Sequence, residues 1–157
     1  MAKNEDFLNL INENQGILHS ICKVYTNNSI DHEDLFQEMM TQLWRGYENF
    51  KGEAKITTWI YRVSLYTAIT HIKKIIRERD TLKDFNTVIH ELPKTEETDE
   101  ELLFRSIKML DSSDRAFILL YLEDKSYKEM ADILGLTESN VGVRLNRIKT
   151  KLKKIMS

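Results

Sequence analysis

The chain has 157 residues, enough for one domain or two small ones, and its scarce glycine and single proline favour a mostly helical protein. Its only cysteine, Cys22, excludes an internal disulfide and is expected to pack as a small apolar side chain. No apolar run approaches the length of a membrane span, and the N-terminus lacks the pattern of a signal peptide. We therefore expect a cytoplasmic protein without membrane insertion.

The formal net charge of −2 hides an uneven distribution of charge along the chain. Residues 1–92 hold 11 basic and 13 acidic groups, and residues 93–124 hold four and nine. Residues 125–157 reverse this balance, with eight basic and three acidic groups. A basic segment of this kind is typical of a nucleic-acid binder, whereas the acidic middle is not.

The first part of the chain shows two short helical patterns and then a break. Apolar residues recur at helical spacing over residues 7–11 and again over residues 17–25. After the break, Asp31 is expected to be the N-cap of a third helix. Glu33 and Asp34 would then fall in its first turn, where the helix dipole favours acids.

The next segment is expected to be a loop followed by a long helix. The loop is expected over residues 46–56, which contain two glycines among mostly polar residues. Thr57 or Thr58 is expected to cap the helix, which runs to about Arg79. The last turns of this helix are basic, which fits complementation of the helix dipole as well as it fits contact with DNA. The residues concerned are Lys73, Lys74, Arg77 and Arg79.

The middle of the chain, residues 80–98, contains the only proline and a run of acids, and it is expected to be a flexible linker. Beyond it, Thr98 or Asp99 is expected to cap one helix, and Ser112 or Ser113 the next. The predicted fold class is therefore all-α, with one small helical domain on each side of the linker. The expected domains are residues 1–79 and 99–157.

Residues 126–154 have the pattern of a helix, a tight turn and a longer basic helix. Gly135 follows the last apolar position of the first helix, where a left-handed residue can end a helix. Thr137 is expected to cap the second helix, whose apolar residues form one narrow stripe. The residues of this stripe are Val141, Leu145, Ile148 and Leu152.

This pattern is the one that a helix-turn-helix DNA-binding unit requires. The first helix and the turn fix the angle of the second helix, whose N-terminal residues reach base edges in the major groove. Arg and Lys supply phosphate contacts, and Arg, Asn or Ser can also bond base edges. The order of Ala131, Gly135, Thr137 and the stripe favours DNA binding over the alternative, a helical hairpin with a solvated basic face.

Three segments of the chain, taken together, resemble the sigma-70 family of bacterial sigma factors. They read, in order, DHEDLFQEMMTQLWRGY, FKGEAKITTWIYRVSLYTAITHIKK and LDSSDRAFILLYLEDKSYKEMADILGLTESNVGVRLNRIKTKLKK. The short two-domain form is similar to the extracytoplasmic-function (ECF) group. The resemblance implies a dissociable subunit that binds core RNA polymerase, recognises two promoter elements, supports strand opening and is later released.

Core RNA polymerase, through its β and β′ subunits, is the first partner that the resemblance implies. In this family a helix of the first domain docks on the coiled coil of β′, and residues 31–45 match that helix. The implied interface residues are Asp34, Gln37, Glu38, Gln42 and Trp44. Dipole complementation by the acids and core packing by Trp44 are both compatible with docking.

Promoter DNA is the second implied partner, because the loop and long helix match the part of the family that opens and reads the minus-ten element. Reading a base in an opened duplex requires a pocket for that base and aromatic rings on which its neighbours stack. For Trp59, core packing stays open as an alternative. The implied residues are Asn49, Phe50, Lys51, Lys55, Thr58, Trp59, Tyr61, Arg62, Lys73, Lys74 and Arg77.

The final basic helix matches the part of the family that reads the minus-thirty-five element. The acidic linker would thread into channels of the polymerase, and an anti-sigma factor is a further partner of many relatives, although no residue identifies one here. The implied residues are Ser139, Asn140, Val143, Arg144, Arg147, Lys149 and Lys151, the last two on phosphate.

The chain departs from the family pattern in both DNA-reading helices. The long helix has Ser64, Tyr66 and Thr70 where alanine, asparagine and aspartate are usual, which bears on promoter reading but not on architecture. The last helix has Gly142 and Val143 where lysine and serine are common. Glycine inside a helix costs roughly 1 kcal/mol relative to alanine, so it either permits close approach to DNA or is simply tolerated.

No catalytic site, metal or cofactor is expected, because the four histidines are scattered and the acids of residues 31–34 lack a calcium-loop pattern. Three rival functions stay open. The first is a stand-alone helix-turn-helix regulator that binds promoters without polymerase. The second is a helical metal or nucleotide enzyme that uses carboxylates of residues 31–45. The third is a sigma-like adaptor that binds polymerase but never opens DNA.

Overall fold

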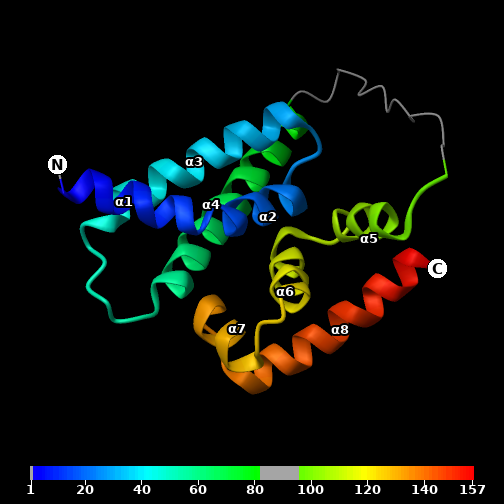
Figure 1. Ribbon diagram of the computed structural model, residues 1–157. Coiled ribbons are helices and arrows are strands. Elements are labelled where there is room, and N and C mark those ends of the chain that lie inside the picture. The colour runs from blue at the N-terminus through cyan, green and yellow to red at the C-terminus, as the bar shows by residue number, and fades with distance from the viewer. Residues whose placement is uncertain (1, 82–95) are drawn as a thin grey trace.

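The computed structural model describes residues 2–81 and 96–157, which form eight helices and no strand (Figure 1). This confirms the predicted all-α fold class. Most of the predicted linker, residues 82–95, lies outside the described residues. The helices are α1 (Ala2–Glu13), α2 (Gln15–Tyr25), α3 (Ser29–Tyr47), α4 (Ile56–Thr81), α5 (Asp99–Ile107), α6 (Ser112–Leu122), α7 (Tyr127–Leu134) and α8 (Glu138–Met156).

In the first domain, α2, α3 and α4 pack together as a bundle, with α1 beside α2 (Figure 1). α1 also reaches the end of α3, where the ring of Phe7 meets that of Trp44 with the centroids 5.1 Å apart. Cys22 is buried, as predicted. The bundle core is apolar and fully buried, and it includes Leu18, Ile21, Leu35, Met39 and Ile60.

The N-cap of α3 is Asn28, so the prediction of Asp31 is wrong. The side chain of Asn28 accepts a hydrogen bond from the backbone N–H of Asp31 at 2.8 Å, and the helix begins at Ser29. Asp31 is therefore the acid of the first turn, and Glu33 and Asp34 lie beyond it. Asn and Asp cap helices about equally well, so the residue types alone do not distinguish the two starts.

α4 begins at Ile56, so Thr57 and Thr58 lie inside the helix and neither is its cap. The backbone N–H of Trp59 donates to the carbonyl oxygen of Lys55 at 3.1 Å, which closes the first turn. Ile56 and Trp59 are both half-buried against the core. Packing of this apolar turn therefore sets the start of the helix, as tertiary contacts commonly do.

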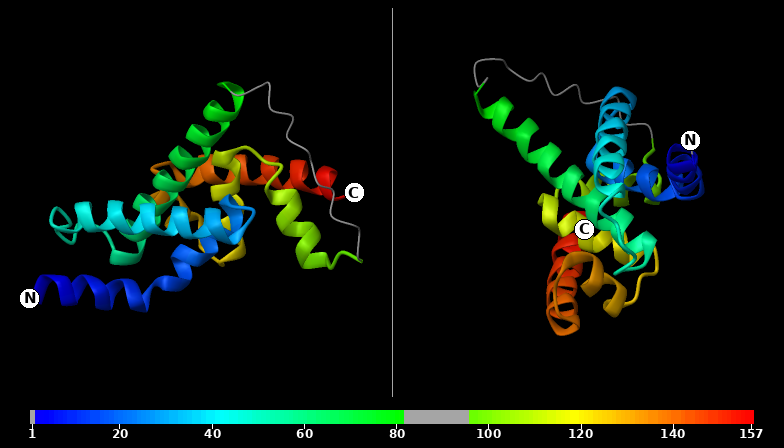
Figure 2. Two further views of the ribbon diagram at one scale, coloured as in Figure 1. Left: turned by 90° about the horizontal axis from the view of Figure 1, so that it is seen from above. Right: turned by 90° about the vertical axis from the view of Figure 1, so that its left-hand side faces the viewer.

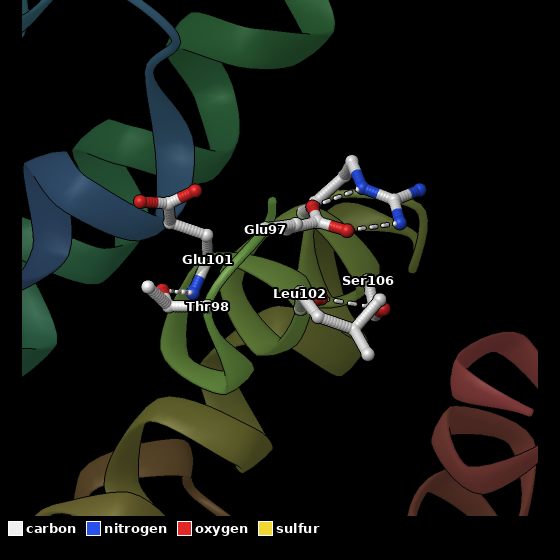
Figure 3. Close-up of polar contacts among 6 residues, drawn as sticks. Glu97, Thr98, Glu101, Leu102 and Ser106 are labelled. Carbon is white, nitrogen blue, oxygen red and sulfur yellow. Dashed lines mark hydrogen bonds and ion pairs between the residues drawn. The ribbon is translucent and has the colours of Figure 1, made fainter. Parts of the chain in front are cut away.

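α5 begins at its predicted cap, at the edge of the second domain. The hydroxyl of Thr98 accepts a hydrogen bond from the backbone N–H of Glu101 at 3.1 Å (Figure 3). One further turn along, Nε of Arg105 donates to Oε1 of Glu97 at 2.7 Å. This pair ties the residues that precede α5 to the helix itself.

α6 is capped by Asp111, so the predictions of Ser112 and Ser113 are wrong. The side chain of Asp111 accepts a hydrogen bond from the backbone N–H of Asp114 at 2.9 Å. The helix begins one residue earlier than the serines suggest because an aspartate directly precedes them. α6 is the central helix of the second domain, and its buried residues are Ala116, Phe117, Ile118, Leu119 and Leu120.

α7 and α8 form the predicted helix, turn and helix. Ser126 and Glu129 make reciprocal capping bonds at the start of α7. Gly135 ends α7 with a φ of 69°, a left-handed conformation that favours glycine. Thr137 caps α8 by accepting from the backbone N–H of Asn140 at 3.2 Å. The predicted stripe is buried in full, at Val141, Leu145, Ile148 and Leu152.

The two domains pack directly against each other, with α6 against α2 and α4, and α7 against α4 (Figure 2). The hydroxyl of Tyr25 donates to the carbonyl oxygen of Ser112 at 2.6 Å. The guanidinium of Arg115 donates to the carbonyl oxygen of Val24 at 3.3 Å. We refer to this packing of the two domains as the closed arrangement.

Candidate functional site

α3 presents a polar surface on the side opposite its buried stripe. Its buried apolar residues recur every four positions, at Leu35, Met39 and Leu43. This spacing turns one face of the helix to the core and leaves the other to solvent. Three of the five residues implied for polymerase docking are exposed: Asp34, Gln37 and Glu38.

The other two docking residues lie at the edges of this surface. Gln42 is half-buried and lines a hollow beside α4. Trp44 is 41% exposed while its ring contacts Phe7 of α1. Trp44 therefore packs against the protein and still offers apolar surface to a partner.

The loop between α3 and α4 gathers residues around a hollow of about 290 Å³. The ring of Trp59 lies 5.2 Å from that of Phe50 and 6.5 Å from that of Tyr47, measured between centroids. Gly52 turns the loop with a φ of 76°. Five residues implied for minus-ten reading line the hollow: Asn49, Phe50, Lys51, Trp59 and Arg62.

A second hollow, of about 540 Å³, adjoins the first and shares Gly46, Trp59 and Arg62 with it. It adds Arg45 and Tyr66, which sequence reasoning did not include among the site residues. Tyr66 is 74% exposed. An exposed aromatic ring beside guanidinium groups suits stacking of an unpaired base. The spacing of four between Arg62 and Tyr66, which places both on one helix face, was the available signal.

The remaining minus-ten residues are spread along α4 and its approach. Lys55 is exposed and Thr58 is half-buried, and neither lines the first hollow. Lys73, Lys74 and Arg77 are exposed in the C-terminal half of the helix. At a rise of 1.5 Å per residue they begin roughly 16 Å beyond Arg62, too far to share its hollow.

Tyr61 and Arg62 contact the second domain. Tyr61 is only 3% exposed, and its hydroxyl donates to the carboxylate of Glu123. Burial, reinforced by this hydrogen bond, raises the pKa of Tyr61 well above its ordinary value. Nε of Arg62 donates to the carbonyl oxygen of Asp132, near the end of α7, at 2.8 Å. The closed arrangement therefore covers part of the implied minus-ten surface.

α8 leaves one side of its N-terminal half open to solvent. Ser139, Asn140, Val143 and Arg147 are exposed there. A Cβ added to Gly142 would lie 3.2 Å from Cε2 of Tyr127 on α7. The glycine therefore allows α7 and α8 to pack closely, a reason that neither sequence-based interpretation of this residue contained.

The other three residues implied for minus-thirty-five reading contact α6. Two of them lie over aromatic rings and one forms an ion pair, and these contacts hold the basic groups along the side of the domain. The guanidinium of Arg144 lies 4.6 Å from the ring centre of Phe117, Nζ of Lys149 lies 3.9 Å from that of Tyr121, and Nζ of Lys151 lies 3.5 Å from Oδ2 of Asp114.

Two further properties concern the described residues, 2–81 and 96–157. No group of three or more His, Cys, Asp or Glu side chains in them is arranged to hold a metal ion. His19 and His32 do meet across α2 and α3, with Nδ1 of the first 2.9 Å from Nε2 of the second. No helix in this part of the chain is long and apolar enough to cross a membrane.

Family models match both domains. The model described as Sigma-70 region 2 matches residues 10–78, and the model described as Sigma-70, region 4 matches residues 101–152. The two matches together span most of the chain and include all of the surfaces described above. The chain belongs to the sigma-70 family. Its function is that of an RNA polymerase sigma factor.

Curated relatives of this sigma factor are themselves RNA polymerase sigma factors. It is 27% identical over 135 residues to RNA polymerase sigma factor YlaC of Bacillus subtilis, a match that covers 80% of this chain and 77% of the relative. It is 28% identical over 145 residues to the ECF RNA polymerase sigma-E factor of Haemophilus influenzae, with the same coverage of 80% and 77%. These relatives support placement in the ECF group.

Solved structures share the fold across both domains. The sigma factor RpoE of Bartonella quintana, solved with the anti-sigma factor NepR, matches with a TM-score of 0.72 and 17% identity over 97% of each chain. CnrH, solved with the cytosolic domain of CnrY, matches with a TM-score of 0.66 and 18% identity over 98% of this chain and 88% of the other. At these identities the likeness shows the fold alone.

Proposed function

We propose that this sigma factor binds core polymerase, directs it to two promoter elements, supports strand opening and is then released. It acts in the cytoplasm and has no catalytic site of its own. The proposed units are a first domain of residues 1–79, a linker of residues 80–98 and a second domain of residues 99–157. The observation that supports this most directly is the gathering of five implied minus-ten residues around one hollow.

The proposed polymerase interface is the exposed face of α3. Asp34 and Glu38 supply negative charge there, and Gln37 supplies an amide. Gln42 and Trp44 extend the surface at its edges, so that a ring and charged groups lie within one helix face. Aromatic side chains are enriched at protein interfaces, and charged groups beside them favour the correct orientation of the partner. We assign this face to the β′ coiled coil.

The proposed minus-ten site is the pair of adjoining hollows beside Trp59 and Arg62. A base that leaves the duplex needs a recess in the protein surface, an aromatic face and a cation for the neighbouring phosphate. The hollows supply all three through Trp59, Arg62 and Lys51. Farther along α4, Lys73, Lys74 and Arg77 would meet backbone phosphates, because their distance from the hollows excludes contact with the same base.

The proposed minus-thirty-five site is the exposed face of α8. Ser139, Asn140 and Val143 lie in its first two turns, which is the part of a recognition helix that reaches base edges. Arg147 follows one turn later on the same side. We assign Lys149 and Lys151 to phosphate contacts, and Arg144 to the flank of the helix beside Phe117.

Promoter opening requires the closed arrangement to open. Tyr61 is bonded to Glu123, directly after α6, and Arg62 to Asp132 of α7, so they meet an unpaired strand only after the domains separate. Two structural neighbours are a sigma factor solved with an anti-sigma factor and a protein solved with a cytosolic domain. We extend the proposal to an anti-sigma partner that binds this chain while the domains are together.

The decisive experiment combines the purified protein with core RNA polymerase and a genomic promoter library, and reads run-off transcripts. Discrete start sites that depend on this protein are the expected result. Polymerase binding without transcripts would favour the sigma-like adaptor. Specific DNA binding without polymerase binding would favour the stand-alone regulator.

A further inference from the structure

A hollow of about 510 Å³ lies where the turn between α2 and α3 faces the second domain. Its wall comes almost entirely from the first domain, and one lysine, Lys108 at the end of α5, comes from the second. The lining is rich in hydrogen-bond donors and includes His19, Lys23, Asn27, Asn28, His32 and Lys108. Ionised carboxylates are absent from the lining of this hollow.

Lys108 is a half-buried cation with no counter-charge. Among the described residues, its ammonium group has neither a hydrogen-bond partner nor an ion-pair partner. Burial lowers its pKa, and the nearby charges of Arg115 and Lys23 lower it further. Each of these causes disfavours the charged ammonium, so the closed arrangement holds a cation that lacks stabilisation.

The neighbouring groups are already committed to other partners. Lys23 pairs with Glu100 at 3.0 Å and lies 4.1 Å above the ring of Phe104. The guanidinium of Arg115 donates to backbone carbonyl oxygens, those of Leu110 at 3.1 Å, Val24 at 3.3 Å and Lys108. These bonds fix Arg115 in place, and no carboxylate of the described residues forms an ion pair with Lys108.

We propose that this hollow binds a small phosphate-class anion, such as inorganic pyrophosphate or the phosphate groups of a nucleotide, and that the bound anion stabilises the closed arrangement. The anion would accept bonds from Lys108, from the side-chain amide of Asn27 and from the one ring N–H that the bonded pair of His19 and His32 does not use between its own rings. The amide of Asn28 already donates to the carboxylate of Asp31 at 3.0 Å. Charge-assisted bonds of this kind are short and strong, and they supply the missing counter-charge.

The position of Lys108 couples anion binding to domain closure. Lys108 belongs to the second domain, whereas all of the other lining residues belong to the first. An anion that contacts both sides binds the closed arrangement more tightly than the open one, so it shifts the equilibrium toward closure. Since closure covers Tyr61 and Arg62, the anion would oppose promoter opening.

The test titrates inorganic pyrophosphate into the full-length protein by calorimetry, with ionic strength held constant by sodium chloride. Wild-type protein should bind one pyrophosphate, and Lys108→Gln should weaken binding by at least about tenfold. The matched control is Lys153→Gln, which removes an equally charged but exposed lysine from α8 and should leave the affinity unchanged. Equal affinity in wild type and Lys108→Gln would overturn the proposal, as would heat no larger than that from sodium chloride.

Two further measurements separate the binding site from a general effect on folding. Without the anion, Lys108→Gln should melt at or above the wild-type temperature, because it removes an unneutralised cation. Lys108→Arg keeps the charge and should keep most of the affinity. Pyrophosphate should reduce the radius of gyration of wild-type protein in small-angle scattering, and an unchanged radius in the presence of binding would overturn the coupling to closure. None of these readouts requires transcription, so they do not depend on the proposed promoter sites.

Discussion

The two domains differ in how far the closed arrangement covers the residues that we propose for DNA contact. In the second domain, Ser139, Asn140 and Arg147 stay exposed on α8. In the first domain, Tyr61 is buried and Arg62 is bonded to α7. The surface proposed for duplex recognition is therefore open in the closed arrangement, whereas the surface proposed for recognition of an opened strand is partly covered.

This difference follows from the chemistry of the two tasks. A basic helix reads duplex DNA from outside, so its contact residues must be exposed and need little apolar surface. Residues that hold an unpaired base need aromatic faces, which are apolar enough to attract a second domain when no DNA is present. The same aromatic and guanidinium groups that suit a single strand thus also suit the contacts of the closed arrangement.

The largest expected effect concerns the exposed face of α3, which lies outside the main contacts between the two domains. Replacing Asp34 and Glu38 together with lysine should weaken binding to core polymerase at least about 100-fold, because like charges facing each other across an interface cost several kcal/mol. Pull-down and fluorescence titration would measure this. The matched control reverses two exposed acids of α1, Glu5 and Glu13, and should bind normally. Normal binding by the Asp34 and Glu38 variant would remove α3 as the docking surface.

The next effect tests whether α8 reads DNA through its exposed face. Arg147→Ala should weaken binding to the minus-thirty-five duplex by about 1–3 kcal/mol and relax its sequence preference. Arg144→Ala should mainly lower the free energy of unfolding, by about 0.5–1 kcal/mol, because its guanidinium stacks on Phe117. Fluorescence anisotropy and urea unfolding separate the two results. A larger loss of DNA affinity from Arg144→Ala than from Arg147→Ala would reverse this assignment.

Local periodicity explains why the helices and the α8 stripe could be predicted. Val141, Leu145 and Ile148 repeat at helical spacing. The turn at Gly135 requires a left-handed conformation, which favours glycine, and a glycine is visible in the sequence. Three helix starts were misplaced for a different reason. Near each of these starts, several neighbouring residues have side chains that can cap a helix. Packing decides which position becomes the start, and it selects Asn28 for α3, Asp111 for α6 and a start before both threonines for α4.

Contacts between the domains could not be predicted from local pattern. Tyr61 and Glu123 lie 62 positions apart, and no periodicity connects them. The role of Gly142 likewise depends on where Tyr127 of another helix comes to lie. The residues of the loop hollow were easier to predict, because its aromatic and basic residues are close together in sequence and match a family motif.

Removing the hydroxyl of Tyr61 should loosen the closed arrangement while keeping the ring. Tyr61→Phe loses a hydrogen bond to the carboxylate of Glu123, which is worth about 1.5 kcal/mol for a partly exposed charged partner. Small-angle scattering should show a larger radius of gyration, and a single-stranded minus-ten oligonucleotide should bind more readily. An unchanged radius together with unchanged strand affinity would show that this contact does not hold the domains.

The same variant has a pH signature. The folded protein raises the pKa of Tyr61, so its contribution to stability is fully present below the unfolded value of about 10 and is lost as pH rises above it. Urea midpoints between pH 8 and pH 11 should therefore fall less steeply in Tyr61→Phe than in wild type. Cys22, whose pKa burial raises to about 12, contributes the same trend to both proteins, as does Tyr25. The difference between the two curves isolates Tyr61.

The smallest expected effect compares one buried serine from each domain. The hydroxyl of Ser64 on α4 is fully buried and has no hydrogen-bond partner among the described residues. The hydroxyl of Ser106 on α5 is also buried, but it donates to the carbonyl oxygen of Leu102 at 2.7 Å (Figure 3).

Ser64→Ala should therefore raise the free energy of unfolding by about 1 kcal/mol, because it removes a buried polar group that has lost its water without gaining a partner. Ser106→Ala is the matched control, and it should lower the same quantity by about 0.5–1 kcal/mol, because it removes a satisfied bond. Urea unfolding of both variants measures the difference in sign. If both substitutions destabilise the protein equally, the Ser64 hydroxyl has a partner in solution, and the first domain loses no stability at this position of α4.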